Sequence, residues 1–170
     1  MFNFFRNRKY KKMIKVGATR VLEDFAQIIN DTISHLEKED RIKSPIHKEV
    51  LKLECTAVVF WFFRYSDVFP ESIRRFTLDE VHQQYLSSLK RNGYSRDQVQ
   101  AVCDELNERY KTYDAFMSKA EDFVGVGTSF ARFVSENAKT GLDATEMTIV
   151  IDLIDQVRLK FKEYREAMAA

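Results

Sequence analysis

Residues 44–63 read SPIHKEVLKLECTAVVFWFF, and this stretch decides the fold. Ser44 can accept a hydrogen bond from a free amide at the start of a helix, and Pro45 suits the first helical turn. From Cys55 to Phe63 every residue except Thr56 is apolar, which predicts a helix buried nearly all round. Such a segment spans about 13 Å, whereas the hydrocarbon core of a bilayer is about 30 Å thick. We therefore expect a core helix and no membrane span.

On both sides of that helix, apolar side chains recur at three- and four-residue steps, the spacing of one helical face. One such stripe runs from Lys9 to Glu39. Three later helix starts are predicted by capping boxes, in which two side chains three positions apart bond each other's backbone amides. These capping boxes are Thr77–Glu80, Ser95–Gln98 and Asp143–Glu146. A short helical turn at 71–75 is expected before the first of them.

Glycines indicate how the helices are joined. Asn92-Gly93 should end a helix, and the short link to Ser95 predicts an antiparallel helical hairpin. Gly125-Val-Gly127 predicts either a break or a kink. The 170 residues include only five glycines and two prolines, too few for the many turns of a β-sandwich. The expected fold is all-α: a single-domain bundle of five to six helices over residues 1–170, with the second helix central and buried.

Residues 1–12 are expected to form a basic N-terminal arm with an aromatic tip. The first 20 residues carry seven of the 27 Lys and Arg residues and no acid, which leaves 20 bases and all 26 acids for the rest. A net charge of +1 therefore hides a positive arm on an acidic body. The residues of the arm expected to contact a membrane or a partner are Phe2, Phe4, Phe5, Arg6, Arg8, Lys9, Lys11 and Lys12.

Three destinations for this arm stay open. The arm can fold back onto the acidic body, with its Phe side chains in a groove. It can also bind an anionic membrane, where each base contributes about 1 kcal/mol and aromatic tips insert at the interface. Nucleic acid phosphates are the third destination. This third one is disfavoured, because the acidic body repels a polyanion and no nucleic-acid-binding motif accompanies the arm.

A second candidate surface is the elbow that follows the buried helix. Pro70 ends or bends that helix, and bases and aromatic residues flank the bend. An elbow between two helices is exposed, so this cluster is the best internal candidate for recognition, against the alternative of a solvated loop with local ion pairs. The cluster consists of Arg64, Tyr65, Phe69, Arg74 and Arg75.

Residues with the potential for chemistry are few. Asp79 and His82 could project from adjacent turns of one helix, but di-metal bundles need a second such pair, so they are only weak metal candidates. Glu54, beside the apolar run, is the other acid in a suggestive setting. The sequence has no phosphate-binding loop and no nucleophile–histidine motif, so no cofactor and no catalytic residue are expected. Cys55 and Cys103 are expected to be buried free thiols.

The composition and motifs favour a non-enzymatic helical interaction module. A protein partner or a homodimer is expected, with an anionic membrane surface as a further contact of the arm. No apolar segment of a secretory signal follows the basic N-terminus, so we expect a cytoplasmic protein, peripheral to the membrane if the arm binds there. The alternative is an enzyme or carrier with a core site for a metal or a small apolar ligand. Its cavity would be lined by Phe60, Trp61, Phe62 and Phe63, one of which could instead be exposed at an interface.

Overall fold

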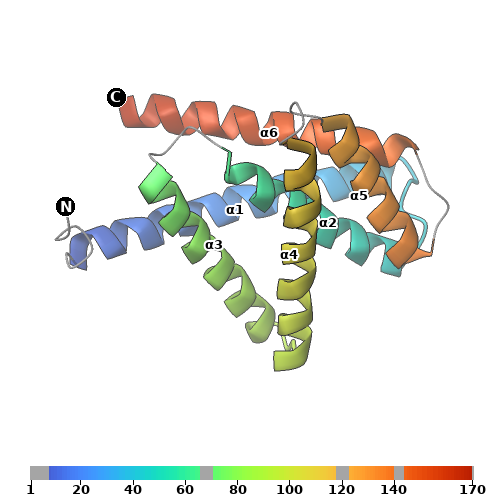
Figure 1. Ribbon diagram of the computed structural model, residues 1–170, viewed down its shortest axis with the longest axis horizontal. Helices are drawn as coiled ribbons and strands as arrows, with labels where there is room; N and C mark the ends of the chain where they lie inside the picture. The colour runs from blue at the N-terminus through green and yellow to red at the C-terminus, as the bar shows by residue number, and fades with distance from the viewer. Residues whose placement is uncertain (1–7, 66–70, 118–122, 140–143, 170) are drawn as a thin grey trace.

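The computed structural model describes residues 8–65, 71–117, 123–139 and 144–169. These residues form six helices and no strand, which confirms the all-α prediction (Figure 1). The helices are α1 (Arg8–Lys38), α2 (Pro45–Phe63), α3 (Glu71–Arg91), α4 (Arg96–Met117), α5 (Phe123–Ala138) and α6 (Ala144–Ala169).

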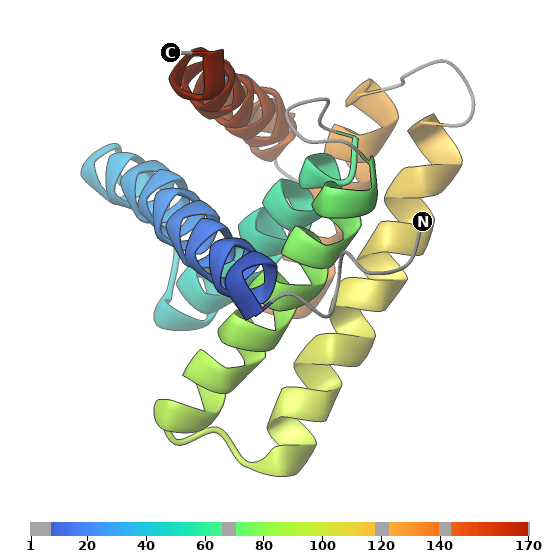
Figure 2. The same ribbon diagram turned by 90° about the vertical axis from the view of Figure 1, so that its left-hand side faces the viewer.

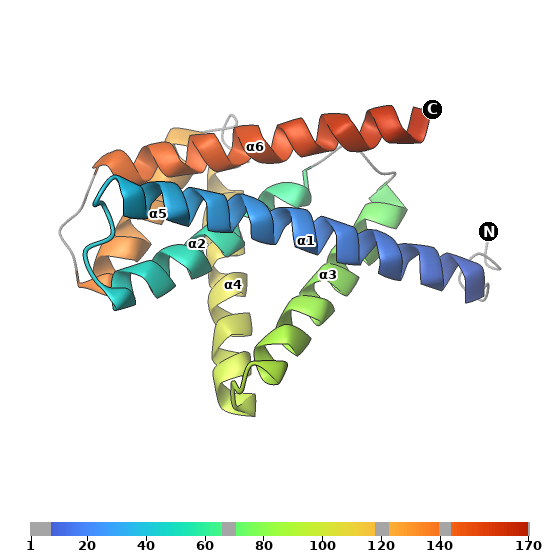
Figure 3. The same ribbon diagram turned by 180° about the vertical axis from the view of Figure 1, so that it is seen from behind.

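Helices α1 and α6 run along the long axis, and the start of α1 and the end of α6 lie at the same end of the molecule (Figures 1 and 3). Helix α2 packs against α1, α4, α5 and α6. Helices α3 and α4 leave their connecting loop as a V that opens toward α1 and α2 (Figure 3). They are the predicted antiparallel pair, but they diverge away from the loop.

Every residue of α2 from Glu54 to Phe63 is buried, as the apolar run predicts. The Phe25 ring of α1 lies 5.7 Å from the Phe63 ring and 6.2 Å from the Phe60 ring, centroid to centroid. Aromatic pairs at such separations add to the stabilisation from buried area. The expectation that one of the aromatic residues at 60–63 is exposed is wrong, because all four are buried.

The helix caps predicted at Ser44 and Ser95 are confirmed. Ser44 Oγ accepts a hydrogen bond from the backbone amide of His47 at 3.1 Å, as expected of a helix N-cap. The Ser95 capping box forms in full, with Ser95 N donating to Gln98 Oε1 and Gln98 N donating to Ser95 Oγ. Gly93, in the preceding loop, has φ of +91°, the conformation that favours glycine after a helix.

The capping box predicted at Thr77 is wrong. Thr77 lies inside α3, where it is buried, and α3 begins at Glu71 rather than after Thr77. The short turn expected at 71–75 is therefore the first part of this longer helix. Glycine and proline are absent between Glu71 and Arg91, so nothing in the backbone interrupts the helix there.

The Gly125-Val-Gly127 segment does not break a helix, since α5 continues through it, and the alternative of a kink stays a prediction. Gly127 instead allows a close approach to α6. A Cβ atom at position 127 would lie 2.9 Å from the backbone oxygen of Met147. The absence of a side chain at Gly127 is thus required by packing between α5 and α6.

A pair of glycine variants tests this packing. Gly127→Ala should lower the free energy of unfolding by about 1–3 kcal/mol, because the clash with the α6 backbone exceeds the helical preference for alanine. Gly17→Ala in α1 should raise it by up to about 1 kcal/mol, because nothing lies within 4 Å of a Cβ atom there. Urea denaturation measures both effects. Equal stabilisation by the two substitutions would contradict the close approach.

Candidate functional site: a cleft between four helices

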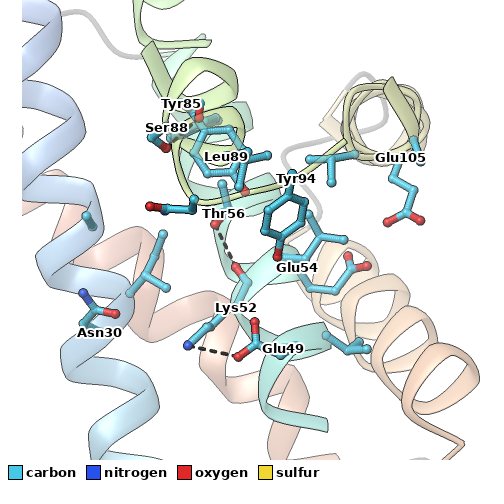
Figure 4. A pocket seen from close by; sticks show the side chains of 18 of the residues that line it. Asn30, Glu49, Lys52, Glu54, Thr56, Tyr85, Ser88, Leu89, Tyr94 and Glu105 are labelled. Carbon is cyan, nitrogen blue, oxygen red and sulfur yellow. Dashed lines mark hydrogen bonds and ion pairs between the residues drawn. The ribbon is translucent and has the colours of Figure 1, made fainter. Parts of the chain in front are cut away.

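A cavity of about 660 Å³ lies between α1, α2, α3 and α4, and Figure 4 shows it from close by. Its walls are mostly apolar, and each of the four helices supplies part of them. The main apolar side chains are Leu22 and Ile29 of α1, Val50, Leu53 and Phe60 of α2, Tyr85 and Leu89 of α3, and Val102 of α4. Ala26 of α1 and Ala101 of α4 also border the cavity, and both are exposed.

Polar side chains make up nearly half of the lining, since nine of its 20 residues are Asn, Ser, Thr, Lys or Glu. Lys52 Nζ lies 3.2 Å from Glu49 Oε1, so these two charges offset each other. Thr56 Oγ1 donates a hydrogen bond to the backbone oxygen of Lys52 at 2.7 Å. The amide side chains of Asn30, Asn92 and Asn137 also border the cavity. The cavity therefore combines apolar surface with several polar groups able to orient a ligand.

Glu54 borders the cavity and forms an ion pair with Arg109 of α4, which does not border the cavity. Arg109 Nε and Nη2 donate to the Glu54 carboxylate at 2.8–3.2 Å, and Tyr113 OH lies 3.5 Å from Glu54 Oε2. Burial raises the pKa of Glu54, although Arg109 opposes that rise. Burial alone would lower the pKa of Arg109, but Glu54 raises it. The guanidinium also lies 3.9 Å from the centroid of the Phe133 ring.

Glu54 was singled out from the sequence, but Arg109 was missed. The available signal was a basic residue on the inward face of α4, between Leu106 and Tyr113, both of which are buried. A charge in such a position needs a partner, because an isolated buried charge is very costly.

A second buried pair was also missed, at the other end of α2. His47 Nε2 lies 3.1 Å from Glu146 Oε1 of α6, and the backbone amide of Lys43 donates to His47 Nδ1. Because Nδ1 accepts a hydrogen bond, Nε2 carries the proton and donates to the carboxylate. Glu146 was predicted to belong to a capping box with Asp143, which lies outside the described residues.

The elbow residues do not form one free cluster. Asp114 of α4 accepts hydrogen bonds from Trp61 Nε1 at 2.8 Å, Tyr65 OH at 2.6 Å and Arg64 Nη1 at 3.0 Å. Arg64 and Tyr65 thus hold the end of α2 against α4. Arg74 is half-buried and Arg75 is exposed on α3, and Phe69 lies outside the described residues.

The two weak metal candidates, Asp79 and His82, differ in their exposure to solvent. Asp79 is exposed, whereas His82 is half-buried, with its Nε2 2.7 Å from Tyr110 OH. Burial lowers the pKa of His82 to about 4, although Asp79 opposes this. Across residues 8–65, 71–117, 123–139 and 144–169, no group of three or more His, Cys, Asp or Glu side chains is arranged to hold a metal ion.

The predicted arm is only partly described. Lys11 and Lys12 are exposed on the first turns of α1, and Arg8 and Lys9 belong to the same helix. The other contact residues predicted for the arm, Phe2, Phe4, Phe5 and Arg6, lie outside the described residues. Within the described ranges, no helix has the length and apolar character needed to cross a bilayer.

The two cysteines differ in environment. Cys55 is fully buried, and burial raises the pKa of its thiol. Cys103 is half-buried, so the prediction of burial is wrong for this residue. It lies on α4, one residue after Val102 on the cavity wall. Both thiols are free, as predicted.

Protein-family models, curated protein sequences and solved structures were each compared with this chain, and none of them matches it.

Proposed function

We propose that this protein binds a small, mainly apolar ligand in the cleft between α1, α2, α3 and α4. The observation that carries the proposal is the cavity itself, whose volume of about 660 Å³ lies within the range of small-molecule sites, roughly 300–1,000 Å³. Phe60 borders this cavity, in line with the carrier alternative from the sequence. Trp61, Phe62 and Phe63 are instead packed in the core.

Binding is favoured over catalysis by the state of the buried acids and bases. Glu54 is held by Arg109, and His47 is held by Glu146. The second pair does not border the cleft. Groups held in this way orient helices, whereas a general base needs to reach a proton on the substrate.

Calorimetric titration with decanol, a neutral alcohol with a ten-carbon chain, tests the proposal. One saturable site with micromolar affinity is expected. Because apolar surface leaves water, the heat-capacity change of binding should be negative. Lack of saturable binding up to the solubility limit of decanol would overturn the proposal.

A second function is favoured by the exposed bases at the start of α1. Lys11, Lys12 and Lys15 are exposed, and Glu23 is the first acid in the sequence. Within the described part of the chain, none of the three lysines forms an ion pair. This end of α1 protrudes beyond the other helices that surround α2 (Figures 1 and 3). We propose that it contacts anionic membrane surfaces, to which each base near the surface contributes about 1 kcal/mol.

Charge reversal tests the membrane contact. The protein should bind phosphatidylserine-containing vesicles at low salt, and binding should weaken as salt rises. Replacing Lys11, Lys12 and Lys15 by Glu should abolish this binding. A control with the same charge change replaces the exposed Lys90, Arg91 and Arg96 by Glu at the loop between α3 and α4. Equal loss in both variants would show that net charge alone attracts the vesicles.

The protein partner or homodimer expected from the sequence remains a prediction.

A further inference from the structure

The charges behind one wall of the cleft do not cancel. Arg109 is shared between two carboxylates, since Nη2 lies 2.8 Å from Glu54 Oε1 and Nη1 lies 3.3 Å from Glu108 Oε2. Glu105 lies one helical turn before Arg109 on α4 and borders the cavity. Three carboxylates therefore surround one guanidinium, and the local charge is negative.

Glu105 is the carboxylate left without a cation. It forms no ion pair with any described residue, and it is only half-buried. Its negative charge helps to raise the pKa of Glu54, after the larger effect of burial, so the two carboxylates lie within electrostatic reach of each other. Lys52 is the one Lys or Arg among the described lining residues, and it is held 3.2 Å from Glu49.

An aromatic ring borders the same part of the cleft. Tyr94 comes from the loop between α3 and α4, and 40% of its surface is exposed. Figure 4 shows its ring between α3 and the side chains of Glu54 and Glu105. The face of an aromatic ring attracts a cation, more strongly where water is partly excluded. A carboxylate and an aromatic ring thus border the same cavity.

Apolar surface continues directly from this acidic end. Leu53 and Val102 border the cavity on the helices that carry Glu54 and Glu105, and Leu89 borders it beside Tyr94. A ligand with its charge beside Glu105 could therefore lay an apolar body along these side chains. Burial of such a body supplies about 25 cal/mol for each Å² removed from water.

We infer that the ligand of the cleft is a small cationic amphiphile, with one positively charged nitrogen beside Glu105 and Tyr94 and a hydrocarbon body against the apolar walls. This inference rests on the proposed function, because it names the chemical class of the ligand for the same cleft. Glu105 supplies the charge selectivity, while the walls supply most of the affinity.

Three probes with the same ten-carbon chain test the inference: decylammonium, decanol and decanoate, each below its micellar concentration. Decylammonium should bind about tenfold more tightly than decanol, the gain expected from one charge-assisted contact. Decanoate should bind about tenfold more weakly than decanol. Rising salt should reduce these differences, because the site is open to solvent.

The substitution Glu105→Gln should reduce the affinity for decylammonium to about that for decanol. The matched control is Asp104→Asn, which removes one charge from the adjacent, exposed position outside the cleft. The control should keep the tenfold preference for decylammonium. Circular dichroism should show the same helix content in both variants.

The outcomes separate the inference from the proposed function. If all three probes bind wild-type protein equally, or if Glu105→Gln keeps the preference for decylammonium, the charge selectivity assigned to Glu105 is wrong and the cleft still binds apolar ligands. If none of the probes binds, the cleft is no ligand site and both proposals are overturned.

Discussion

Replacing Arg109 by Met should lower the free energy of unfolding by about 3–5 kcal/mol at neutral pH, because Glu54 would remain buried without its cation. The Glu54 side chain is 1% exposed and the Arg109 side chain 6%, so solvent cannot take the place of the guanidinium. Methionine keeps an unbranched side chain but removes the charge, its hydrogen bonds and the contact of the guanidinium with the Phe133 ring. Urea denaturation followed by circular dichroism measures the loss.

A double variant distinguishes the cost of a lone buried charge from the value of the pair. Glu54→Leu combined with Arg109→Met should recover most of the stability lost by Arg109→Met alone, because a buried ion pair is often replaceable by apolar side chains of similar size. If the stability lost by the double variant instead equals the sum of the losses of Glu54→Leu and Arg109→Met alone, the pair itself stabilises the fold strongly. A loss below about 1 kcal/mol for Arg109→Met would contradict the buried arrangement.

The stability loss of Arg109→Met should also depend on pH. Burial already raises the pKa of Glu54, and removing Arg109 removes the group that opposes this rise most. A carboxyl group with a higher pKa in the folded state than in the unfolded state binds protons more tightly when folded. Lowering the pH through the folded-state pKa toward the unfolded value of 4.5 should therefore shrink the difference from wild-type protein. A difference that grows as the pH falls would contradict this sign.

The second large effect is expected from closing the cleft. Ala26 borders the cavity and is exposed, so Ala26→Trp should place an indole in the open space without overpacking the core. The affinity for decanol should fall by at least about 30-fold, which corresponds to about 2 kcal/mol. Calorimetric titration measures the loss, and thermal unfolding checks that the variant stays folded.

The matched control for Ala26→Trp places the same side chain outside the cleft. Ala167 is exposed near the end of α6 and does not border the cavity. Ala167→Trp should leave the affinity for decanol within about twofold of wild-type protein. Retention of full affinity by Ala26→Trp would locate the binding site elsewhere in the molecule.

The parts of the fold that follow from local chemistry were predictable. The N-cap at Ser44, the capping box at Ser95 and the left-handed Gly93 depend on neighbouring backbone atoms, and each forms as expected. The Thr77 pattern shows the limit of such signals. The same residue types occur in the interior of a helix, and burial of Thr77 there depends on contacts that the local pattern does not encode.

The buried pairs could be predicted only in part. Glu54 stands out from its apolar neighbours, but its partner lies 55 residues away on another helix. His47 and Glu146 are 99 residues apart. Each residue lies on the inward face of its helix, so a buried polar position could be inferred. The pairing itself depends on which helices are neighbours, and helical periodicity does not specify this.

The cleft could not be predicted from the sequence. Its walls consist of side chains that also suit an ordinary core, such as Leu53 and Phe60. The cavity lies between helices that include α3 and α4, which diverge from their loop in Figure 3. In the side view of Figure 2 the same two helices run in similar directions, so they diverge mainly in the plane of Figure 3. The sequence encodes the short loop, whereas the angle between the two helices depends on packing of α3 against α1 and of α4 against α2 and α5.

The central claim is that the cleft binds an apolar chain, and an NMR measurement of ligand position tests it most directly. With decanol at saturation, nuclear Overhauser effects should connect the alkyl protons of decanol with the methyl groups of Leu22, Leu53 and Val102, which come from three different helices of the cleft. Val157 of α6 is buried outside the cavity, and its methyl groups should show no such effect. Effects confined to α6, or their absence from all three cleft residues, would contradict the account.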